Sequence, residues 1–485
     1  MSEYVMRTGS GTGLATRFLA VTTRPALTAS LLLFGDLTAL LVSGALAVGL
    51  RHLLDGGFNP VVYIPLWPVA GLFVLVYALV GLYPGVGLAP AEELRRLTLA
   101  TTLVYLVLGA GTFLFKEGDA YSRAVFLGAW AFSVVLVPLS RALVRHLFAK
   151  KKWWGYPVLV LGAGKTGRMV VRTLKRQPGL GLKPVAVLDD DPEKHGALEG
   201  VPVVGGVELA PVIARELGIR HAIVAMPGVP RGKLLDLLEQ YGGVFPHLVL
   251  IPDLFGFSSL WVSAQDLGGV LGLEVRQRLL FASPRILKRV MDVAIGAVGG
   301  LLLSPLLAAI AILIKMDSPG AVLYGHTRIG QGGRRFIAWK FRSMVVDADR
   351  VLEEYLAKRP ELREEWERDQ KLKNDPRVTR VGRILRKLSL DELPQLWNVI
   401  KGEMSLVGPR PIVQDELAKY GDKGTFYLKV KPGMTGLWQV SGRNDISYKE
   451  RVELDVYYVR NWSVWLDLYI LARTVWVVLF GKGAY

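Results

Sequence analysis

Two adjacent carboxylates, Asp391 and Glu392, are the residues best suited to group-transfer chemistry in this chain. Paired acids can divide the work of phosphoryl transfer, because one carboxylate can attack phosphorus while the other holds a metal ion. A stripe of cations precedes them at helical spacing: Arg377, Arg380, Arg383 and Lys387. Such a stripe either solvates a helix surface or contacts phosphates and lipid headgroups. Its position directly before the acidic pair favours phosphates.

Pro394 decides where the helix that follows the acidic pair begins. A capping box, with Ser389 as N-cap and Glu392 at the third position, would put Pro394 at the fifth helical position, where its missing N–H is needed. We therefore predict that the helix begins at Asp391 or Glu392, with Pro394 in the first turn. Asp391 then lies at a helix N-terminus, where backbone N–H groups and the helix dipole favour a phosphate. A plain capping role for Asp391 is the alternative.

Three further segments carry side chains that suit phosphate contact. Residues 336–344 have the pattern of a short strand with two cations alternating on one face. Residues 408–411 form a Gly-Pro-Arg-Pro turn that presents one guanidinium, which suits bidentate contact with a phosphate. Residues 433–443 form a glycine-rich loop with an aromatic residue and an arginine. The side chains expected to contact substrate or phosphate are Lys340, Arg342, Arg383, Arg410, Arg443 and Asp455.

An uncharged apolar segment, Val293–Ile314, is long enough to cross a bilayer. Ser304 and Pro305 lie at its centre, and a proline there removes a backbone donor, so that the freed carbonyl needs a local donor such as Ser304. Cations flank the segment: Lys288, Arg289, Lys315 and Arg328. The residues alone leave two structures open. One is a proline-kinked span, and the other is a helix over 284–316 that is broken at Ser304-Pro305 and enters and leaves the membrane on one face.

Residues 1–152 contain four apolar stretches, each close to the roughly 20 residues that cross a bilayer as a helix. The stretches are Ala26–Leu50, Val61–Tyr83, Leu97–Phe115 and Val125–Leu147. Lys and Arg are more frequent before the first stretch, between the second and third, and after the fourth, which indicates four spans with both ends in the cytosol. We expect no ionisable pair within these spans, and we interpret the block as an anchor and not as a lipid or polysaccharide pathway.

Residues 153–275 carry a nucleotide-binding pattern. A buried strand leads into the glycine fingerprint of Gly162, Gly164 and Gly167, and Asp189 ends the next strand. An acid at that spacing can bind a ribose hydroxyl. Further alternation of strands and helices predicts a parallel, helix-covered sheet. Because no candidate for hydride transfer stands out, we favour a scaffold or regulatory role over binding of NAD or another nucleotide.

Composition limits the chemistry further. The chain has 485 residues, of which 51% are hydrophobic, and a net charge of +17. These values fit a membrane protein of about three domains, and the charge suits nucleic acid, anionic lipid or phosphorylated substrates equally. The absence of cysteine excludes disulfides, thiolate nucleophiles and Cys-based metal sites. The six histidines are scattered, which argues against a zinc site.

The catalytic motifs resemble those of the bacterial sugar transferases, the polyprenyl-phosphate hexose-1-phosphate transferases or monotopic phosphoglycosyl transferases. The motifs that carry the resemblance are Ser304-Pro305, Lys340-Phe-Arg342-Ser-Met344, Asp391-Glu392, Pro409-Arg410-Pro411 and the run from Pro432 to Val440. The first half of the chain resembles the long form of this family, whose members initiate O-antigen, capsule or exopolysaccharide synthesis. The resemblance therefore implies a membrane protein of mixed fold with three parts. They are a four-helix transmembrane block in 1–152, a Rossmann-like α/β module in 153–275, and an α/β monotopic catalytic domain in 276–485 whose membrane helix is re-entrant.

The resemblance also implies a mechanism and partners. Asp391 would attack the sugar-proximal phosphorus of a UDP-sugar and expel UMP, and undecaprenyl phosphate would then take up the phosphosugar. Glu392 would hold Mg²⁺, while Arg410 and neighbouring cations would position phosphates. The protein would be a multi-pass protein of the bacterial inner membrane with its catalytic domain on the cytosolic face, in contact with membrane lipids and not with nucleic acid. The family suggests galactose or glucose as the sugar, and a homodimer is an open alternative to a monomer.

Three other functions compete with this one. A membrane nucleotide-sugar dehydratase would need a Tyr-x-x-x-Lys helix; Tyr427 and Lys431 match the letters, but Pro432 follows at once and there is no second glycine fingerprint. A scaffold would sense nucleotide through the Gly162 loop without catalysis. A glycosyltransferase would transfer the sugar without its phosphate and release UDP.

Overall fold

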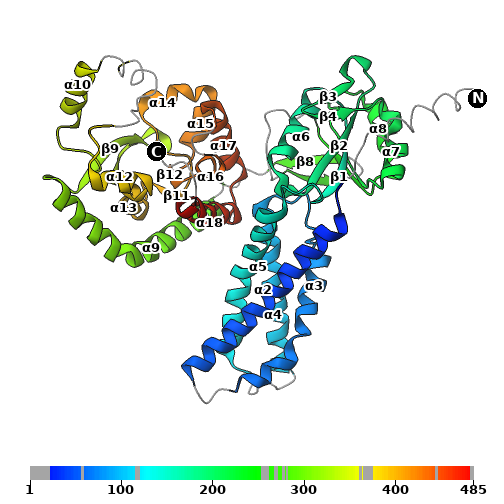
Figure 1. Cartoon of the computed structure of the whole chain (residues 1–485), viewed down its shortest axis with the longest axis horizontal. Helices are drawn as coiled ribbons and strands as arrows, with labels where there is room; N and C mark the ends of the chain where they lie inside the picture. Colours follow the sequence, from blue (N-terminus) through cyan, green and yellow to red (C-terminus); the bar gives the residue numbers. More distant parts are fainter. Residues whose placement is uncertain are drawn as a thin grey trace, which may run out of the picture. The chain divides into compact units, whose positions relative to one another are not determined.

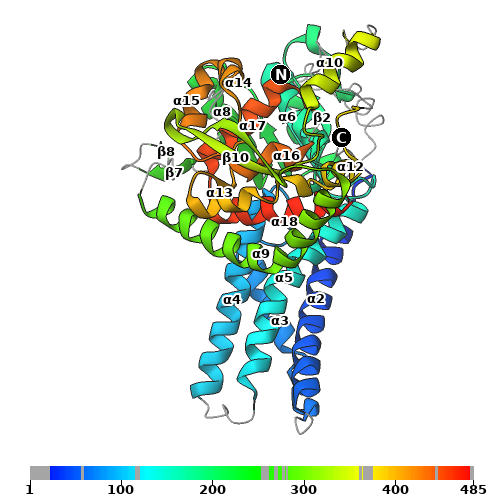
Figure 2. The same cartoon turned by 90° about the vertical axis from the view of Figure 1, so that its left-hand side faces the viewer.

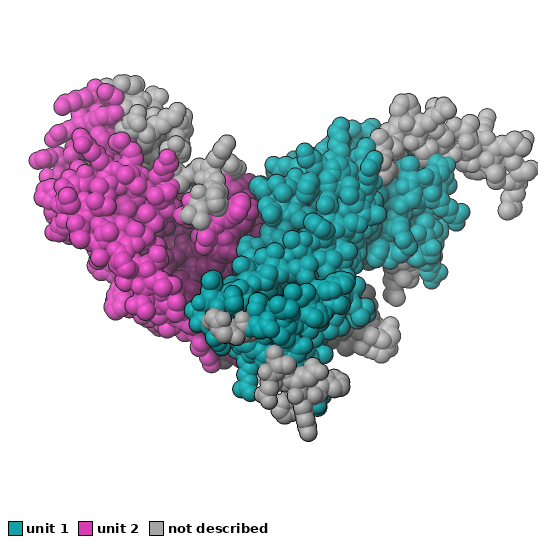
Figure 3. Space-filling model, turned by 60° about the horizontal axis from the view of Figure 1, so that its bottom comes forward, with its two compact units in different colours: residues 1–255 teal, residues 256–485 magenta. Residues whose placement is uncertain are grey.

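The computed structural model describes residues 22–55, 59–114, 121–252, 262–266, 271–275, 279, 282–359, 363, 375–442 and 446–480. The chain divides into two compact units, residues 1–255 and 256–485, which are coloured separately in Figure 3. The first unit contains the predicted spans and the glycine fingerprint. The second contains the apolar segment with Pro305 and the acidic pair.

A helical bundle forms one end of the first unit (Figure 1). Its long helices are α2 (Pro25–Leu54), α4 (Pro90–Leu114) and α5 (Arg123–Phe148). Their outward side chains are large and apolar: Phe34, Leu106 and Leu127 are 69%, 65% and 60% exposed. Lipid accommodates such a surface and water does not. Within the described residues, four helices are long and apolar enough to cross a membrane, namely these three and α9 (Ala282–Asp317) of the second unit.

The second predicted span, Val61–Tyr83, is not one straight helix. A 3₁₀ helix, η1 (Pro60–Leu66), is followed by α3 (Val69–Leu79), and the two are bent by 44° relative to each other. Pro65 lies inside η1 and Pro68 is the N-cap of α3, and each lacks the N–H that a continuous helix requires. The bent pair makes a fifth candidate span only if it is counted as one element.

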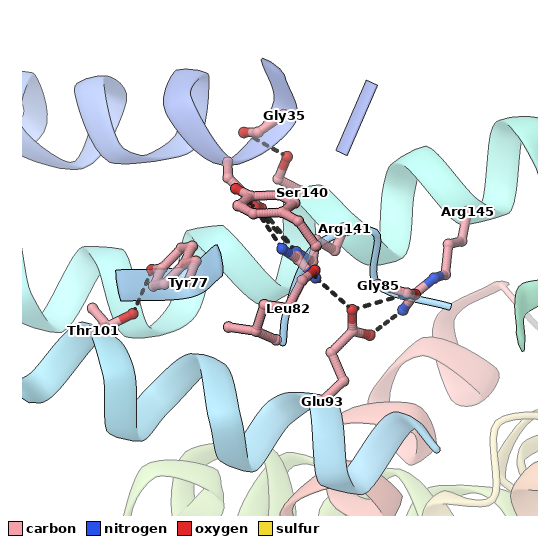
Figure 4. Close-up of polar contacts among 11 residues, drawn as sticks. Gly35, Tyr77, Leu82, Gly85, Glu93, Thr101, Ser140, Arg141 and Arg145 are labelled. Carbon is pink, nitrogen blue, oxygen red and sulfur yellow. Dashed lines mark hydrogen bonds and ion pairs between the residues drawn. The ribbon is translucent and has the colours of Figure 1, made fainter. Parts of the chain in front are cut away.

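A buried ion network joins α2, α4 and α5 (Figure 4). Arg141 on α5 donates to Asp36 at 2.7 Å and to Glu93 at 2.8 Å, and all three side chains are at most 7% exposed. Arg145 also pairs with Glu93, and the Tyr83 hydroxyl donates to Asp36 at 2.6 Å. The expectation that the spans contain no ionisable pair is therefore wrong. Asp36 and Arg141 are 105 residues apart, so only the packing of α2 against α5 reveals them as partners.

The network is formally neutral, because two acids meet two guanidiniums. A fully paired, neutral network offers no free charge to attract or relay an ion. Arg141 and Arg145 also donate to the backbone carbonyls of Leu82 and Gly85, at 3.1 and 2.9 Å, and so fasten the turn after α3 to α5. These contacts stabilise the bundle. They are compatible with the interpretation of residues 1–152 as an anchor.

The rest of the first unit is a six-stranded sheet with a core on each face. The strand order is β3-β4-β2-β1-β5-β6, and every neighbouring pair is parallel except β3 with β4. The strands are β1 (Tyr156–Leu161), β2 (Leu182–Leu188), β3 (Gly196–Leu198), β4 (Val201–Val203), β5 (His221–Val224) and β6 (His247–Leu250). The helices are α6 (Lys165–Arg176), α7 (Ala210–Leu217) and α8 (Arg231–Gly242). The predicted parallel, helix-covered sheet is present, because apolar residues of the strands pack on both faces.

The second unit is a mixed fold of short strand pairs and helices. The pairs are β7 (Val262–Asp266) with β8 (Leu271–Val275), β9 (Leu323–Ile329) with β10 (Arg335–Phe341), and β11 (Ser405–Val407) with β12 (Gly433–Thr435). The helices after α9 are α10 (Ala348–Lys358), α12 (Arg380–Lys387), η7 (Leu390–Glu392), α13 (Gln395–Lys401), α14 (Gln414–Lys419), α15 (Gly424–Leu428), α16 (Leu437–Ser441), α17 (Tyr448–Asn461) and α18 (Val464–Phe480). The β7–β8 hairpin, which the sequence assigns to the module in 153–275, falls in this unit and does not join the six-stranded sheet.

Helix α9 is a single bowed helix along the second unit (Figures 1 and 2). The predicted break at Ser304-Pro305 is therefore wrong, because the helix continues through Pro305. Pro305 lies inside it, and the carbonyl that proline leaves unpaired one turn earlier is that of Leu301. The Ser304 hydroxyl donates to this carbonyl at 2.7 Å, as the sequence predicts. Leu301 and Leu302 are each 75% exposed, so the apolar surface beside the proline is uncovered by protein.

Both ends of α9 contact the body of the same unit. Near its start, Lys288 donates to Asp467 of α18 at 2.7 Å. At its end, Asp317 accepts from the backbone N–H of Val381 at 3.0 Å. Directly after it, Arg342 donates to the carbonyls of residues 318 and 319 at 2.7 and 2.6 Å. The exposed apolar stretch lies between these two attachments.

Candidate functional site

The acidic pair lies in η7, a single 3₁₀ turn between α12 and α13. The chain enters this turn through Ser389, whose φ of 56° is in the left-handed region, and Ser389 makes no side-chain capping bond. Helix α13 begins only at Gln395, with Pro394 as its N-cap. The capping box is thus rightly rejected, but the predicted helix start at Asp391 or Glu392 is wrong. Pro394 lacks an N–H and stands just before the first helical turn, so the acids are left in the preceding turn.

Because α13 begins at Gln395, the dipole of this helix does not act at Asp391. A helix N-terminus at Asp391 would favour a phosphate through its dipole. Helix α13 has only seven residues and begins four residues after Asp391. The electrostatics of the site therefore come from side chains.

Glu392 is held between two cations. Lys340 Nζ on β10 lies 2.6 Å from Glu392 Oε1, and Arg410 Nη2 lies 3.8 Å from the same oxygen. Burial alone would raise the pKa of Glu392, but Lys340 and Arg410 outweigh it and hold that pKa below its usual range. Glu392 is therefore an ionised carboxylate at neutral pH.

Asp391 has the opposite environment. Burial raises the pKa of this carboxyl, the charge of Glu392 adds to the rise, and Lys340 and Arg386 oppose it. A carboxylate with a raised pKa is more basic, and so is a better nucleophile once ionised. The two neighbouring acids are thus set apart by their surroundings: the pKa of Glu392 is lowered, and the pKa of Asp391 is raised.

The structure brings Lys340 and Arg410 to the acidic pair, as predicted, but it does not bring all the expected residues there. Arg342 is 9% exposed and is engaged by the carbonyls that follow α9. Arg383 is exposed on α12, whereas Arg386 donates to Ser343 Oγ at 2.9 Å and is close enough to lower the pKa of Asp391. Arg443 lies outside the described residues.

The β9–β10 hairpin supplies cationic and imidazole groups that sequence reasoning missed. Tyr324 lies directly opposite Lys340 in the register, so His326 and Arg328, two and four residues on, are on the same face of the hairpin as Lys340. Burial lowers the pKa of His326, and Arg328 and Lys340 lower it further, so the imidazole is neutral at pH 7. Strand alternation in 323–329 is the signal that could have found these residues.

A second missed group lies around Trp438. The Arg410 guanidinium carbon is 6.0 Å from the centre of the Trp438 ring, and that of Arg451 on α17 is 4.7 Å from it. Arg451 Nη2 is 3.8 Å from Glu416 Oε2 on α14. No spacing rule links residues 410, 416, 438 and 451, because they come from four separate segments.

Asp455 lies in the core and not on a surface open to a phosphate. It is 2% exposed on α17, and Oδ2 accepts from the Tyr420 hydroxyl at 2.8 Å. Burial raises its pKa to about 7, although the Tyr420 bond and Arg451 oppose the rise. A position of this kind indicates support for α17 more than contact with substrate.

We expect Asp455→Asn to change the pH dependence of stability. The folded pKa of about 7 exceeds the ordinary value of 3.8, so this group stabilises the fold fully below pH 3.8. The contribution is lost as the pH rises through about 7. Asparagine cannot ionise and still offers Tyr420 an acceptor. The melting temperature of the variant, measured relative to wild type, should therefore rise by on the order of a few degrees between pH 5 and pH 8. A constant difference across that range would contradict the raised pKa.

The glycine fingerprint of the first unit is explained by packing. A Cβ on Gly162 would lie 2.5 Å from Met226 Cγ, and one on Gly167 would lie 1.9 Å from the Gly162 carbonyl oxygen, whereas Gly164 has open space. Asp189 accepts from the Ala163 N–H at 2.7 Å, so the acid expected to bind a ribose is engaged by the loop itself. These contacts support the scaffold interpretation, and binding of NAD or another nucleotide stays an untested prediction.

The fold and the site together fit a membrane-anchored group-transfer enzyme, because the chain has helices apolar enough to cross a membrane and an acidic pair beside cations. Comparison with known proteins gives the family. The Bacterial sugar transferase family matches residues 283–481, and the CoA-binding domain family matches residues 78–252. The chain belongs to the bacterial sugar transferase family, in the long form that also carries the N-terminal half.

Three relatives illustrate this membership. The UDP-galactose-lipid carrier transferase of Erwinia amylovora is 43% identical over 75% of this chain and 76% of its own. The undecaprenyl-phosphate galactose phosphotransferase of Salmonella typhimurium is 39% identical over 81% and 82%. The UDP-glucose:undecaprenyl-phosphate glucose-1-phosphate transferase of Escherichia coli is 33% identical over 82% and 84%. The resemblance drawn from the motifs is confirmed.

Proposed function

We propose that this chain transfers a hexose 1-phosphate from a UDP-hexose to undecaprenyl phosphate and releases UMP. The observation that carries the proposal is the pair of unlike acids: Asp391 with a raised pKa, beside Glu392 held ionised by Lys340 and Arg410. The relatives' names support the same donor and acceptor. The product would begin a bacterial exopolysaccharide, O-antigen or capsule.

The reaction would run in two displacements. An oxygen of ionised Asp391 attacks the sugar-proximal phosphorus of the UDP-hexose, and the bond from that phosphorus to the bridging oxygen breaks. UMP leaves with the bridging oxygen, and an aspartyl-phosphohexose remains. A phosphate oxygen of undecaprenyl phosphate then attacks the same phosphorus and frees the Asp391 carboxylate. One diphosphate bond is exchanged for another, so no further energy source is required.

The cations of the site would stabilise the charge that shifts during both steps. Lys340 and Arg410 already lie beside the acids, and Arg328 and Arg386 are close enough to influence their pKa values. Donors fixed in a partly buried site stabilise a transferring phosphoryl group better than water does. The bridging oxygen gains a negative charge as it leaves with UMP, and the cations near Arg410 would stabilise that charge.

Glu392 would hold a magnesium ion. Lys340 and Arg410 both contact Oε1 of Glu392, so Oε2 is the oxygen that a cation would take. One carboxylate together with substrate phosphates is a common ligand set for Mg²⁺. When bound, the ion would neutralise charge on the diphosphate.

The contacts of α9 support a membrane placement of the second unit. Lys288 and Asp317, at its two ends, are both attached to the same unit. A helix that crossed the bilayer would separate its ends by about 30 Å of hydrocarbon. We therefore infer that α9 enters and leaves on one face, with the catalytic unit in the cytosol and the protein in the inner membrane. Labelling of Lys315 by an impermeant amine reagent outside sealed cells would contradict this placement.

The products of one assay test the function. Purified full-length protein is incubated with undecaprenyl phosphate, Mg²⁺ and a panel of UDP-sugars, and the released nucleotide is identified. The proposal predicts UMP, since the phosphate next to the sugar is transferred with it. Release of UDP would indicate glycosyl transfer, and no turnover with any donor would favour a scaffold.

A further inference from the structure

The group around Trp438 has hydrogen-bonding atoms that the two displacements do not use. Trp438 Nε1 and both Nε and Nη2 of Arg451 are buried and have no hydrogen-bond partner among the described residues. Trp438 is 7% exposed, and the Arg451 side chain is 14% exposed. Buried donors without partners are unfavourable, so clustered ones point to a missing ligand.

An acceptor lies beside these donors. Glu416 Oε2 is 3.8 Å from Arg451 Nη2, which is too far for a hydrogen bond and leaves both groups able to bind a third. Glu416 is 33% exposed, so its carboxylate is within reach of a ligand. The cluster therefore offers the indole N–H of Trp438 and the guanidinium N–H groups of Arg451 as hydrogen-bond donors, and the carboxylate of Glu416 as an acceptor.

The hydrogen-bonding groups of this cluster indicate which part of the UDP-hexose they would bind. A phosphate only accepts hydrogen bonds, so it would leave the Glu416 carboxylate without a donor. Sugar hydroxyls both donate and accept, and a carboxylate with a guanidinium matches them. The ring of Trp438 is flanked by Arg410 and Arg451, so its role is to hold the cations in place.

The position agrees with the composition. Arg410 contacts Glu392 at one side and Trp438 at the other, so the cluster lies one side chain away from the acids. The hexose of the donor is bonded directly to the phosphate that Asp391 would attack. The groups that bind that hexose would therefore lie close to the acids, as this cluster does, whereas the uracil is separated from the reacting phosphorus by a further phosphate and a ribose.

We propose that Glu416, Arg451 and Trp438 form the hexose subsite and decide which UDP-hexose is accepted. This inference rests on the proposed function. Galactose and glucose differ in the orientation of one hydroxyl, and both sugars occur in the names of relatives. A site that hydrogen-bonds a hydroxyl discriminates strongly, because the wrong sugar leaves its buried groups unpaired.

The test measures kcat/KM for UDP-galactose and UDP-glucose and the inhibition constant of UMP, which lacks the hexose. The full chain in nanodiscs is used as wild type, Glu416→Gln, Arg451→Lys and Trp438→Phe. Asp415→Asn is the matched control, since this acid precedes Glu416 on α14 and is exposed. We expect Glu416→Gln and Arg451→Lys to lower kcat/KM for the preferred UDP-hexose by about 30-fold. The ratio of kcat/KM between the two UDP-hexoses should fall by at least about 10-fold. The inhibition constant of UMP should stay within about 2-fold of wild type in these variants. The kcat/KM values of the Asp415→Asn enzyme should also stay within about 2-fold of wild type.

Two results would overturn the subsite. The first is a ratio of kcat/KM for UDP-galactose and UDP-glucose that stays within about 2-fold of wild type in both Glu416→Gln and Arg451→Lys, whether or not the rates fall. The second is a loss of UMP affinity that matches the loss of kcat/KM, because the cluster would then bind the nucleotide. UMP inhibition also reports that each variant is folded. Failure of the proposed function would look different, since wild type itself would release no UMP.

Discussion

An Asp391→Asn enzyme will release UMP at least about 10⁴-fold more slowly than wild type, because an amide oxygen is a poor nucleophile toward phosphorus. The change preserves size and removes only the charge. Since Asp391 is partly buried in a turn and its pKa is raised by burial, losing that charge should not destabilise the fold. The loss would thus be chemical and not structural. It is measured as UMP formed from the preferred UDP-hexose, with melting temperature as the check on folding.

A second measurement separates a nucleophile from a residue that only orients substrate. Without undecaprenyl phosphate, wild type should retain labelled hexose on the protein after denaturation, in an amount up to one per chain, and Asp391→Asn should retain none. Glu392→Gln should still acquire label, but slowly, because its role is to hold charge beside the phosphate. Labelled Asp391→Asn protein, or UMP release near the wild-type rate, would remove Asp391 as the nucleophile.

Arg141→Leu will cost about 3–5 kcal/mol of stability, on the order of 10 °C in melting temperature. Asp36 is fully buried and accepts from Arg141 through both of its oxygens, so the variant would strand its charge inside the bundle. Glu93 would still have Arg145. The measurement is thermal unfolding of the full chain in detergent, followed by size-exclusion chromatography.

Two variants control for the loss of a cation as such. Arg51→Leu removes a guanidinium of α2 whose ion pair with Asp55 is 36% and 46% exposed, so it should change stability by no more than about 1 kcal/mol. Asp36→Leu combined with Arg141→Leu should recover at least half of the loss, because apolar pairs replace buried ion pairs at little cost. An Arg141→Leu protein that melts within about 2 °C of wild type would show that the network contributes little.

Local features of the chain could be predicted because they depend on neighbours in sequence. Hydrophobic length identifies α2, α4, α5 and α9, and short apolar runs identify the strands of the module. Even the bond from Ser304 to the Leu301 carbonyl follows from the position of Pro305, since proline frees the carbonyl four residues earlier. In each case the interacting groups lie within a turn or two of each other.

Boundaries and bends were harder to predict. Two prolines in the second apolar stretch divide it into η1 and α3, although its hydrophobicity alone suggests one span. Pro394 is compatible with several helix starts, and the left-handed Ser389 decides among them by turning the chain before Asp391. Such choices are small differences in backbone energy, and packing settles them.

From the sequence alone we could name the groups proposed for the chemistry, which are the adjacent acids and the cations of two motifs, and the apolar helices of the anchor. The sequence did not determine which cations meet which acids. Lys340 reaches Glu392 across 52 residues, and Arg141 reaches Asp36 across 105. Arg386, and not the predicted Arg383, is close enough to lower the pKa of Asp391, and Arg342 donates to the carbonyls that follow α9. Side-chain partners of this kind depend on how separate elements pack, because no residue spacing encodes a contact between distant segments; tertiary structure alone places Glu416 and Arg451 beside Trp438.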